Sequence, residues 1–215
     1  MTTAAPQSTP ARVVLRPIAT PLPLGFVALM VATGSFAAVQ LGWVPPDQGR
    51  FAAYAALLFT APLQALASVF GFLARDPVAS TGMGVLAGTW ATLGMATLLS
   101  PPGTLSPGLG VVLILAAVAL LVPAAAAVAK PVVASVVGLS ALRFFVTGLA
   151  MTTGSQGWLK AAGWTGLVLA ALSLYAALAL ELEAARHRQV LPLLRRGSGA
   201  EWIATQEEPG VRSDL

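Results

Sequence analysis

Six long apolar runs follow one another along the chain, separated by short segments rich in proline, glycine and charged residues. The runs are expected at 21–44, 51–74, 78–99, 109–129, 131–153 and 161–182. Each has about the 20 apolar residues that a helix needs to cross a hydrocarbon core of roughly 30 Å. The pattern therefore predicts an all-α membrane protein, with six transmembrane helices within residues 21–185.

The composition supports a membrane protein over a soluble one. Of 215 residues, 57% are hydrophobic and 9% are charged, whereas soluble domains have about 25% charged residues. The mean hydropathy is +0.82. Six spans leave little chain for a separate soluble domain, so we expect one bundle. Cysteine is absent, which excludes disulfides, thiol nucleophiles and thiolate metal sites, and no cofactor is expected.

The basic residues indicate the orientation of the chain. Although the pI is near 10.4, Lys and Arg stand beside apolar runs rather than on a polar surface, which argues against a nucleic-acid partner. With six crossings, the inner side would hold Arg12, Arg16, Arg75, Lys130, Arg186, Arg188, Arg195, Arg196 and Arg212. The outer side would hold Arg50 and Lys160. This asymmetry predicts that both termini are cytoplasmic in a multi-pass protein of the cytoplasmic (inner) membrane.

The two ends of the chain differ from the apolar middle. Residues 1–20 have no apolar core, and no short apolar run is followed by a small-residue cleavage site, so we expect a disordered cytosolic tail and no cleaved signal peptide. Residues 186–215 begin with a basic cluster and continue as a polar stretch. They are predicted to form a second cytosolic tail.

Polar side chains inside the predicted spans are the candidates for function. Arg143 is the one basic residue deep within a predicted span, and an arginine at the bilayer centre costs about 2.5–3.5 kcal/mol on insertion scales. It either packs against a carbonyl, Gln64 or a neighbouring subunit, or it forms a cationic site for a carboxylate in transit, whose geometry matches the guanidinium. Gln64 likewise bonds either a neighbouring helix or a substrate.

The sequence lacks the features of an enzyme site. No cluster of acid, base or nucleophilic groups lies at membrane depth. The single histidine, His187, falls in the basic segment beyond the last span. A phosphate-binding glycine loop is also absent. We therefore expect a protein that is not an enzyme, and transport is the function that remains.

A family resemblance is clearest around the last span. Ala162–Leu167 reads A-G-W-T-G-L, Tyr175 follows eight residues later, and Arg188–Pro192 reads R-Q-V-L-P. This arrangement resembles the closing signature of the acetate uptake transporter family, which includes succinate and acetate permeases, and it aligns without a gap. The family has a carboxylate at the position of Leu180, whereas this chain has Glu181 beside it.

The resemblance also assigns positions in the other spans. Gln64 matches the glutamine of the family's G-G-x-A-Q element, and Thr81 is kept from a polar element in the third span. Leu29 and Leu86 stand where relatives have a phenylalanine and a tyrosine. Ser140 stands at a leucine associated with the narrowest part of the family's path. The resemblance thus implies an altered constriction, with a positive charge three residues further on.

The resemblance implies a permease for small carboxylates such as acetate and succinate, coupled to protons. Relatives form homo-hexameric rings with one pathway in each protomer. The candidate path residues are Leu29, Gln64, Thr81, Leu86, Ser140, Arg143 and Tyr175. Two alternatives stay open: a passive channel for small neutral or anionic solutes, and a membrane scaffold that transports nothing. The expected partners are a small carboxylate, protons, membrane lipid and further copies of the chain.

Overall fold

The computed structural model describes residues 18–186 and 188–194, and this part of the chain is helical without strands. The elements are α1 (Leu22–Gln40), η1 (Pro46–Gln48), α2 (Gly49–Tyr54), η2 (Ala55–Thr60), α3 (Ala61–Leu73), α4 (Pro77–Leu99), α5 (Pro107–Ala126), α6 (Pro131–Thr153) and α7 (Gln156–Arg186). Because η1, α2, η2 and α3 form one continuous span, six helical segments are long and apolar enough to cross a membrane. The prediction of an all-helical fold with six spans is confirmed.

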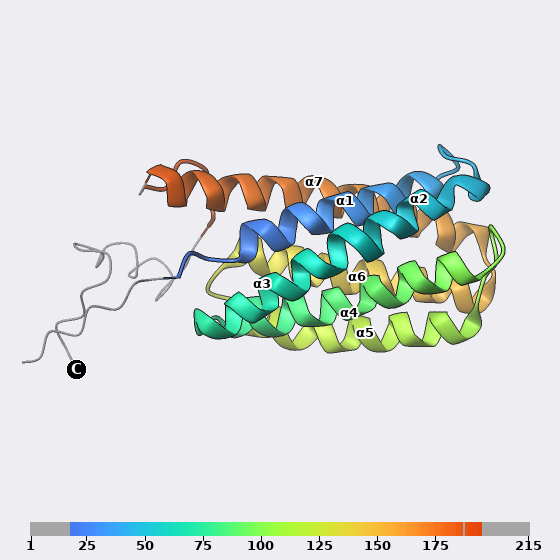
Figure 1. The fold of residues 1–215 in the computed structure, drawn as a ribbon, viewed down its shortest axis with the longest axis horizontal. Coiled ribbons are helices and arrows are strands. Elements are labelled where there is room, and N and C mark those ends of the chain that lie inside the picture. Colours follow the sequence, from blue (N-terminus) through green and yellow to red (C-terminus); the bar gives the residue numbers. More distant parts are fainter. Residues whose placement is uncertain (1–17, 187, 195–215) are drawn as a thin grey trace, which may run out of the picture.

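The spans lie side by side along the long axis of one bundle and alternate in direction (Figure 1). The beginning of α1 and the end of α7 lie at the same end, called here the terminal end. The opposite end, called here the loop end, carries the connections that follow α1, α4 and α6. This arrangement is the one an even number of crossings requires.

The second span changes its helical geometry in the middle. Residues Ala55–Thr60 form a π-helical segment that ends two residues before Pro62. A proline in a regular α-helix clashes with the carbonyl four residues earlier and lacks its own N–H, and a wider turn relieves both problems. The segment also directs Thr60 toward α1, where its hydroxyl donates a hydrogen bond to the carbonyl of Ala28 at 2.8 Å. Pro62 therefore lies within a continuous helical span.

Glycines allow the backbones of α5 and α6 to approach each other closely. A Cβ atom on Gly148 would lie 2.7 Å from the carbonyl oxygen of Gly110, and a Cβ on Gly110 would lie 2.8 Å from that of Gly148. Ile114 packs over Gly148 from the same side. Lipid tails are as apolar as leucine, so helices in a bilayer associate through such close packing rather than by burial from water. These glycines are needed for backbone contact.

The last helix extends beyond the apolar run that predicts it. Its 31 residues correspond to about 46 Å at 1.5 Å per residue, more than the roughly 30 Å of a hydrocarbon core. The helix starts at Gln156, immediately after Gly154 turns the chain in a left-handed conformation with φ of 68°. Both helix ends are polar and can lie among lipid headgroups, which is why hydropathy underestimates the length.

The segment after α7 folds back on the bundle. Residues Arg188–Leu194 are described, and Leu193 is buried among the core side chains. The hydroxyl of Tyr175 donates a hydrogen bond to the carbonyl of Pro192 at 2.7 Å. The other residues of the two expected tails, 1–17 and 195–215, lie outside the described residues, as does His187.

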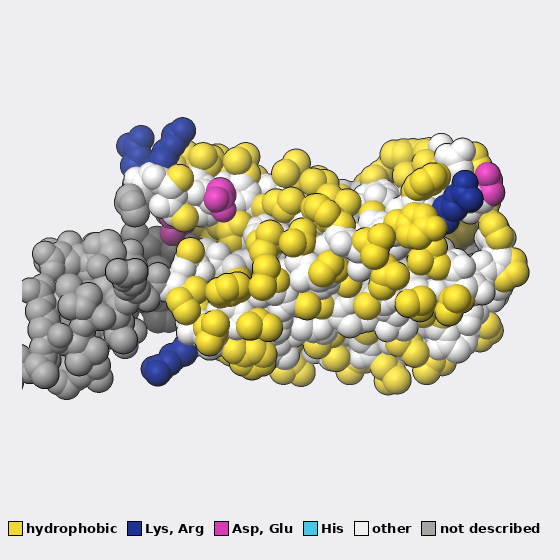
Figure 2. All heavy atoms as spheres, viewed as in Figure 1, with side chains coloured by type: hydrophobic (Ala, Val, Ile, Leu, Met, Phe, Trp, Pro, Cys, Tyr) yellow, Lys and Arg dark blue, Asp and Glu magenta, His cyan; other side chains and the backbone are white. Residues whose placement is uncertain are grey.

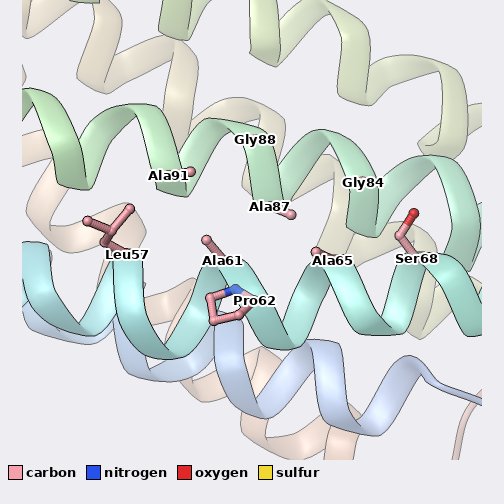
Figure 3. A pocket seen from close by; sticks show the side chains of 9 residues that line it. All are labelled: Leu57, Ala61, Pro62, Ala65, Ser68, Gly84, Ala87, Gly88 and Ala91. Carbon is pink, nitrogen blue, oxygen red and sulfur yellow. The ribbon is translucent and has the colours of Figure 1, made fainter.

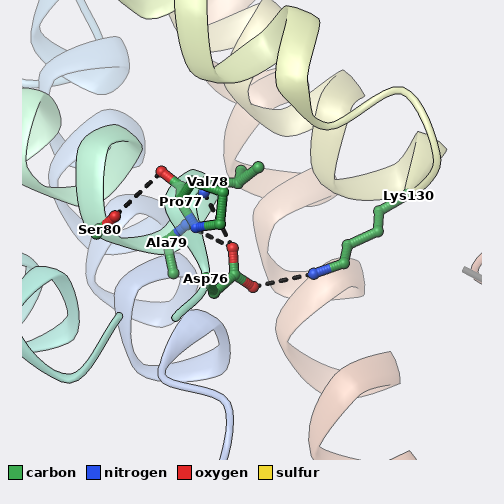
Figure 4. Close-up of polar contacts among 6 residues, drawn as sticks. All are labelled: Asp76, Pro77, Val78, Ala79, Ser80 and Lys130. Carbon is green, nitrogen blue, oxygen red and sulfur yellow. Dashed lines mark hydrogen bonds and ion pairs between the residues drawn. The ribbon is translucent and has the colours of Figure 1, made fainter. Parts of the chain in front are cut away.

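The surface matches a bundle that spans a bilayer. Hydrophobic side chains cover the middle of the face in Figure 2, and charged side chains lie at its two ends. At the terminal end, Lys130 pairs with Asp76 at 2.9 Å, and Asp76 also accepts hydrogen bonds from the backbone N–H groups of Val78 and Ala79 (Figure 4). This cap stabilises the start of α4 by about 1 kcal/mol. The protein is therefore a multi-pass membrane protein.

Candidate functional site

Arg143 lies inside the bundle and is only 1% exposed. Its Nε donates to the hydroxyl of Thr33 at 2.6 Å, and Nη1 donates to Oε1 of Gln40 at 2.9 Å. Nη1 also donates to the carbonyl of Ala162 at 2.6 Å and lies 3.4 Å from the hydroxyl of Thr147. The guanidinium is therefore held by groups on α1, α6 and α7.

The helix spacing explains how these groups converge. Thr33 and Gln40 stand seven residues apart and so share one face of α1. Thr147 is four residues beyond Arg143, on the same face of α6, and its hydroxyl donates back to the carbonyl of Arg143 at 2.7 Å. Gln40 is the last residue of α1, and Ala162 lies in the first two turns of α7. The guanidinium therefore reaches from the middle of α6 toward the loop end.

Gly166 makes room for this side chain. A Cβ atom there would lie 2.8 Å from Cζ and 2.9 Å from Nε of Arg143, and 3.0 Å from Cβ of Ala37. One helical turn earlier, a Cβ on Gly163 would lie 2.6 Å from Cγ of Leu41. The two glycines of the A-G-W-T-G-L segment thus allow α7 to approach α1 with the guanidinium between them.

The charge of Arg143 has no acidic partner within the described residues. Every group that accepts a hydrogen bond from it is a neutral hydroxyl, amide or carbonyl. The ion pair that the described residues form elsewhere joins Lys130 to Asp76 at the terminal end. The Nη2 atom of Arg143 makes no hydrogen bond to a described residue. The described residues also hold no group of three His, Cys, Asp or Glu side chains that could bind a metal.

Gln64 is a second fully buried polar side chain, located on α3. Its Nε2 donates to the carbonyl of Gly25 on α1 at 3.2 Å. Its Oε1 has no hydrogen-bond partner among the described residues. It therefore makes one helix-to-helix hydrogen bond, keeps one free acceptor in the interior, and does not bond to Arg143.

The three candidate constriction residues are completely buried on three different helices. Leu29 is on α1, Leu86 on α4 and Ser140 on α6, and each is 0% exposed. The Ser140 hydroxyl donates to the carbonyl of Val136 within its own helix at 2.8 Å. Gln64 and Arg143 are buried as well, so five of the seven candidate path residues lie in the bundle interior.

Thr81 and Tyr175 lie elsewhere. Thr81 is on the exposed face of α4. Tyr175 is half-buried and is bonded to the segment that folds back after α7. The resemblance relates these two residues to the family's path, whereas the structure separates them from the interior candidates.

A groove with a volume of about 530 Å³ lies between the second and third spans (Figure 3). It is lined by Leu57, Ala61, Pro62, Ala65, Ser68, Gly84, Ala87, Gly88 and Ala91. None of the candidate path residues lines it. Its one hydroxyl, on Ser68, is already bonded to the carbonyl of Ser80 at 2.6 Å. This apolar groove offers no group that would bind a carboxylate.

Several interior residues were not anticipated from the sequence. Thr33, Gln40 and Thr147 hold Arg143, and the signal for them was a polar side chain within an apolar run. Trp90 lies between Phe36 and Phe144, with ring centroids 5.8 and 5.2 Å away. Its Nε1 has no hydrogen-bond partner among the described residues. No sequence pattern showed that this indole would be central.

Comparisons with known proteins support the fold. No protein-family model matches the chain, and no curated protein matches it in sequence. Among solved structures, it is similar to one described as "Structure of the bacterial acetate channel SatP", with a TM-score of 0.72 and 22% sequence identity. The alignment covers 81% of this chain and 98% of that one. At this identity the similarity establishes a shared six-helix membrane fold.

Proposed function

We propose that this protein lets small carboxylates such as acetate cross the cytoplasmic membrane through the interior of its own helical bundle. The observation that carries the proposal is the buried guanidinium of Arg143, which has no acidic partner among the described residues. The bundle around it has the fold of a protein described as an acetate channel. A carboxylate loses much hydration energy in hydrocarbon, and a fixed cation compensates for part of that loss.

The path is assigned to the five buried candidates. Arg143 attracts the carboxylate, and the amide of Gln64 and the hydroxyl of Ser140 offer polar contacts along the interior. Leu29 and Leu86 form the apolar wall. Thr81 and Tyr175 are left out of this path because one faces outward and the other bonds to the segment after α7.

The finer features of the proposal follow from the family resemblance. The protein would be a divergent member of the acetate uptake transporter family that carries a proton with the carboxylate, accepts succinate as well, and assembles as a homo-hexamer with one pathway per protomer. The basic residues at the terminal end, Arg75, Lys130, Arg186 and Arg188, outnumber Arg50 and Lys160 at the loop end. By the positive-inside rule, the terminal end then faces the cytoplasm.

Uptake of labelled acetate by proteoliposomes tests the function. Acetic acid crosses lipid in its neutral form, so the assay is run at about pH 8, where nearly all of a carboxylic acid with a pKa of about 4 is ionised. We expect faster uptake than in protein-free liposomes, and a further increase when the outside is made more acidic than the lumen. The matched control is the same acidification applied to protein-free liposomes.

The outcome separates three functions. Uptake that follows the proton gradient supports coupled transport. Uptake that exceeds the protein-free rate but ignores the gradient identifies a passive channel, a function favoured by the described activity of the similar structure. Uptake equal to that of protein-free liposomes rejects both and leaves a membrane scaffold.

A further inference from the structure

We infer that the unbonded Nη2 edge of Arg143 is an anion-binding subsite, which selects small carboxylates in their ionised form over neutral molecules of the same shape. The inference rests on the proposed function, because it names the charge state of the substrate at one point of that path.

The guanidinium is fixed on two of its three nitrogens. Nε is bonded to Thr33, and Nη1 is bonded to Gln40 and to the carbonyl of Ala162. The surface of Gly166 closes the site from α7. Since these contacts come from α1 and α7 while the side chain extends from α6, the planar group cannot turn without breaking several hydrogen bonds. Its orientation is therefore set before any ligand arrives.

The donors left over are those that an anion requires. Nη2 carries two N–H groups, and neither donates to a described residue. The three acceptors on Thr33, Gln40 and Ala162 are neutral, so they satisfy hydrogen bonds without neutralising the charge. A bound anion supplies both missing elements, an acceptor for Nη2 and a negative charge. A neutral amide supplies only the acceptor.

The position of the subsite suggests where selection takes place. Gln40 ends α1 and is half-buried, so the network links the buried guanidinium to the loop end of the bundle. Leu29, Leu86 and Ser140, the candidate constriction residues, make no hydrogen bond to Arg143 or to the groups that hold it. The subsite is thus placed to select an anion arriving from the loop end before it passes the apolar residues.

Thermal unfolding of the purified protein in detergent gives a test that does not depend on transport. Acetate and acetamide have nearly the same shape but differ in charge. We expect acetate to raise Tm in a concentration-dependent manner and acetamide to leave it unchanged at the same concentration. In R143Q the acetate effect should need at least about a tenfold higher concentration, since hydrogen bonds to charged groups are worth about 1.5–3 kcal/mol. G138A, on the same helix with open space at its Cβ, should behave like the wild type.

The result decides the inference even if R143Q does not fold. Equal stabilisation of the wild-type protein by acetate and acetamide would overturn it, as would an acetate response in folded R143Q equal to that of the wild type. If either of these results is found and the wild-type protein still takes up acetate in proteoliposomes, the anion subsite is rejected and the proposed function stands. If acetate stabilises the wild type selectively but no uptake occurs, the subsite exists and the proposed function fails.

Discussion

Replacing Gly148 by leucine is expected to destabilise the bundle by about 3 kcal/mol or more, at the upper end of the range for overpacked cores. A Cβ atom at this position would lie 2.6 Å from Cγ1 of Ile114 and 2.7 Å from the carbonyl oxygen of Gly110. The isoleucine side chain can move, but the carbonyl belongs to the backbone of α5. The two helices must therefore separate, and their close contact is lost along its length. Unfolding in detergent, followed by circular dichroism, measures the loss.

Gly138 provides the matched control on the same helix. A Cβ atom there has no neighbour within 4 Å among the described residues. We therefore expect G138L to unfold close to the wild-type temperature, because the added side chain begins in open space. If G148L and G138L unfold alike, the close approach of α5 and α6 does not determine stability.

Replacing Gly166 by alanine is expected to reduce acetate uptake by about tenfold or more, which corresponds to the loss of one charge-assisted hydrogen bond. The added methyl group would lie 2.8 Å from Cζ of Arg143 and 3.0 Å from Cβ of Ala37. The guanidinium must move, because the neighbouring helix α1 is packed behind it. Its bonds to Thr33 and Gln40 then lengthen or break. The initial rate of labelled acetate uptake, corrected for the amount of reconstituted protein, measures the effect.

The charge itself is unchanged in this variant, so the experiment tests the position of the guanidinium rather than its presence. G138A controls for adding a methyl group to a glycine of the spans, since its Cβ meets open space, and its uptake should match the wild type. Thermal unfolding of G166A shows whether the fold is kept. A folded G166A protein with wild-type uptake would contradict the role given to the fixed orientation of Arg143.

The architecture could be predicted because hydropathy alone determines it. A run of about 20 apolar residues must be helical in lipid, whatever it packs against. The fifth run illustrates this, since 131–153 coincides with α6. Hydropathy fails where helix ends leave the hydrocarbon, as in α7, and where the backbone changes without a change in polarity. The π-helical segment Ala55–Thr60 is an example of the second kind.

The site could be predicted only in part. Arg143 was identified because a buried charge is costly in any fold. Its partners Thr33 and Gln40 are 110 and 103 residues away in the chain, and hydropathy does not relate one span to another. In most spans the apolar residues are distributed almost evenly around the helix. The sequence therefore did not show which face of α4 turns inward. For that reason the resemblance could suggest Thr81 but could not show that it faces outward.

A small, negatively charged thiol reagent can test most directly whether the carboxylate route runs through the bundle interior. The chain has no cysteine, so a single Ser140→Cys substitution, nearly equal in shape, introduces one reactive group. Ser68→Cys, which places a thiol at the groove between α3 and α4, serves as the control. We predict that the reagent modifies Cys at position 140 in proteoliposomes and that acetate slows this reaction but not the reaction at position 68. A thiol at position 140 that stays unmodified, or that reacts at the same rate with and without acetate, would contradict an interior route.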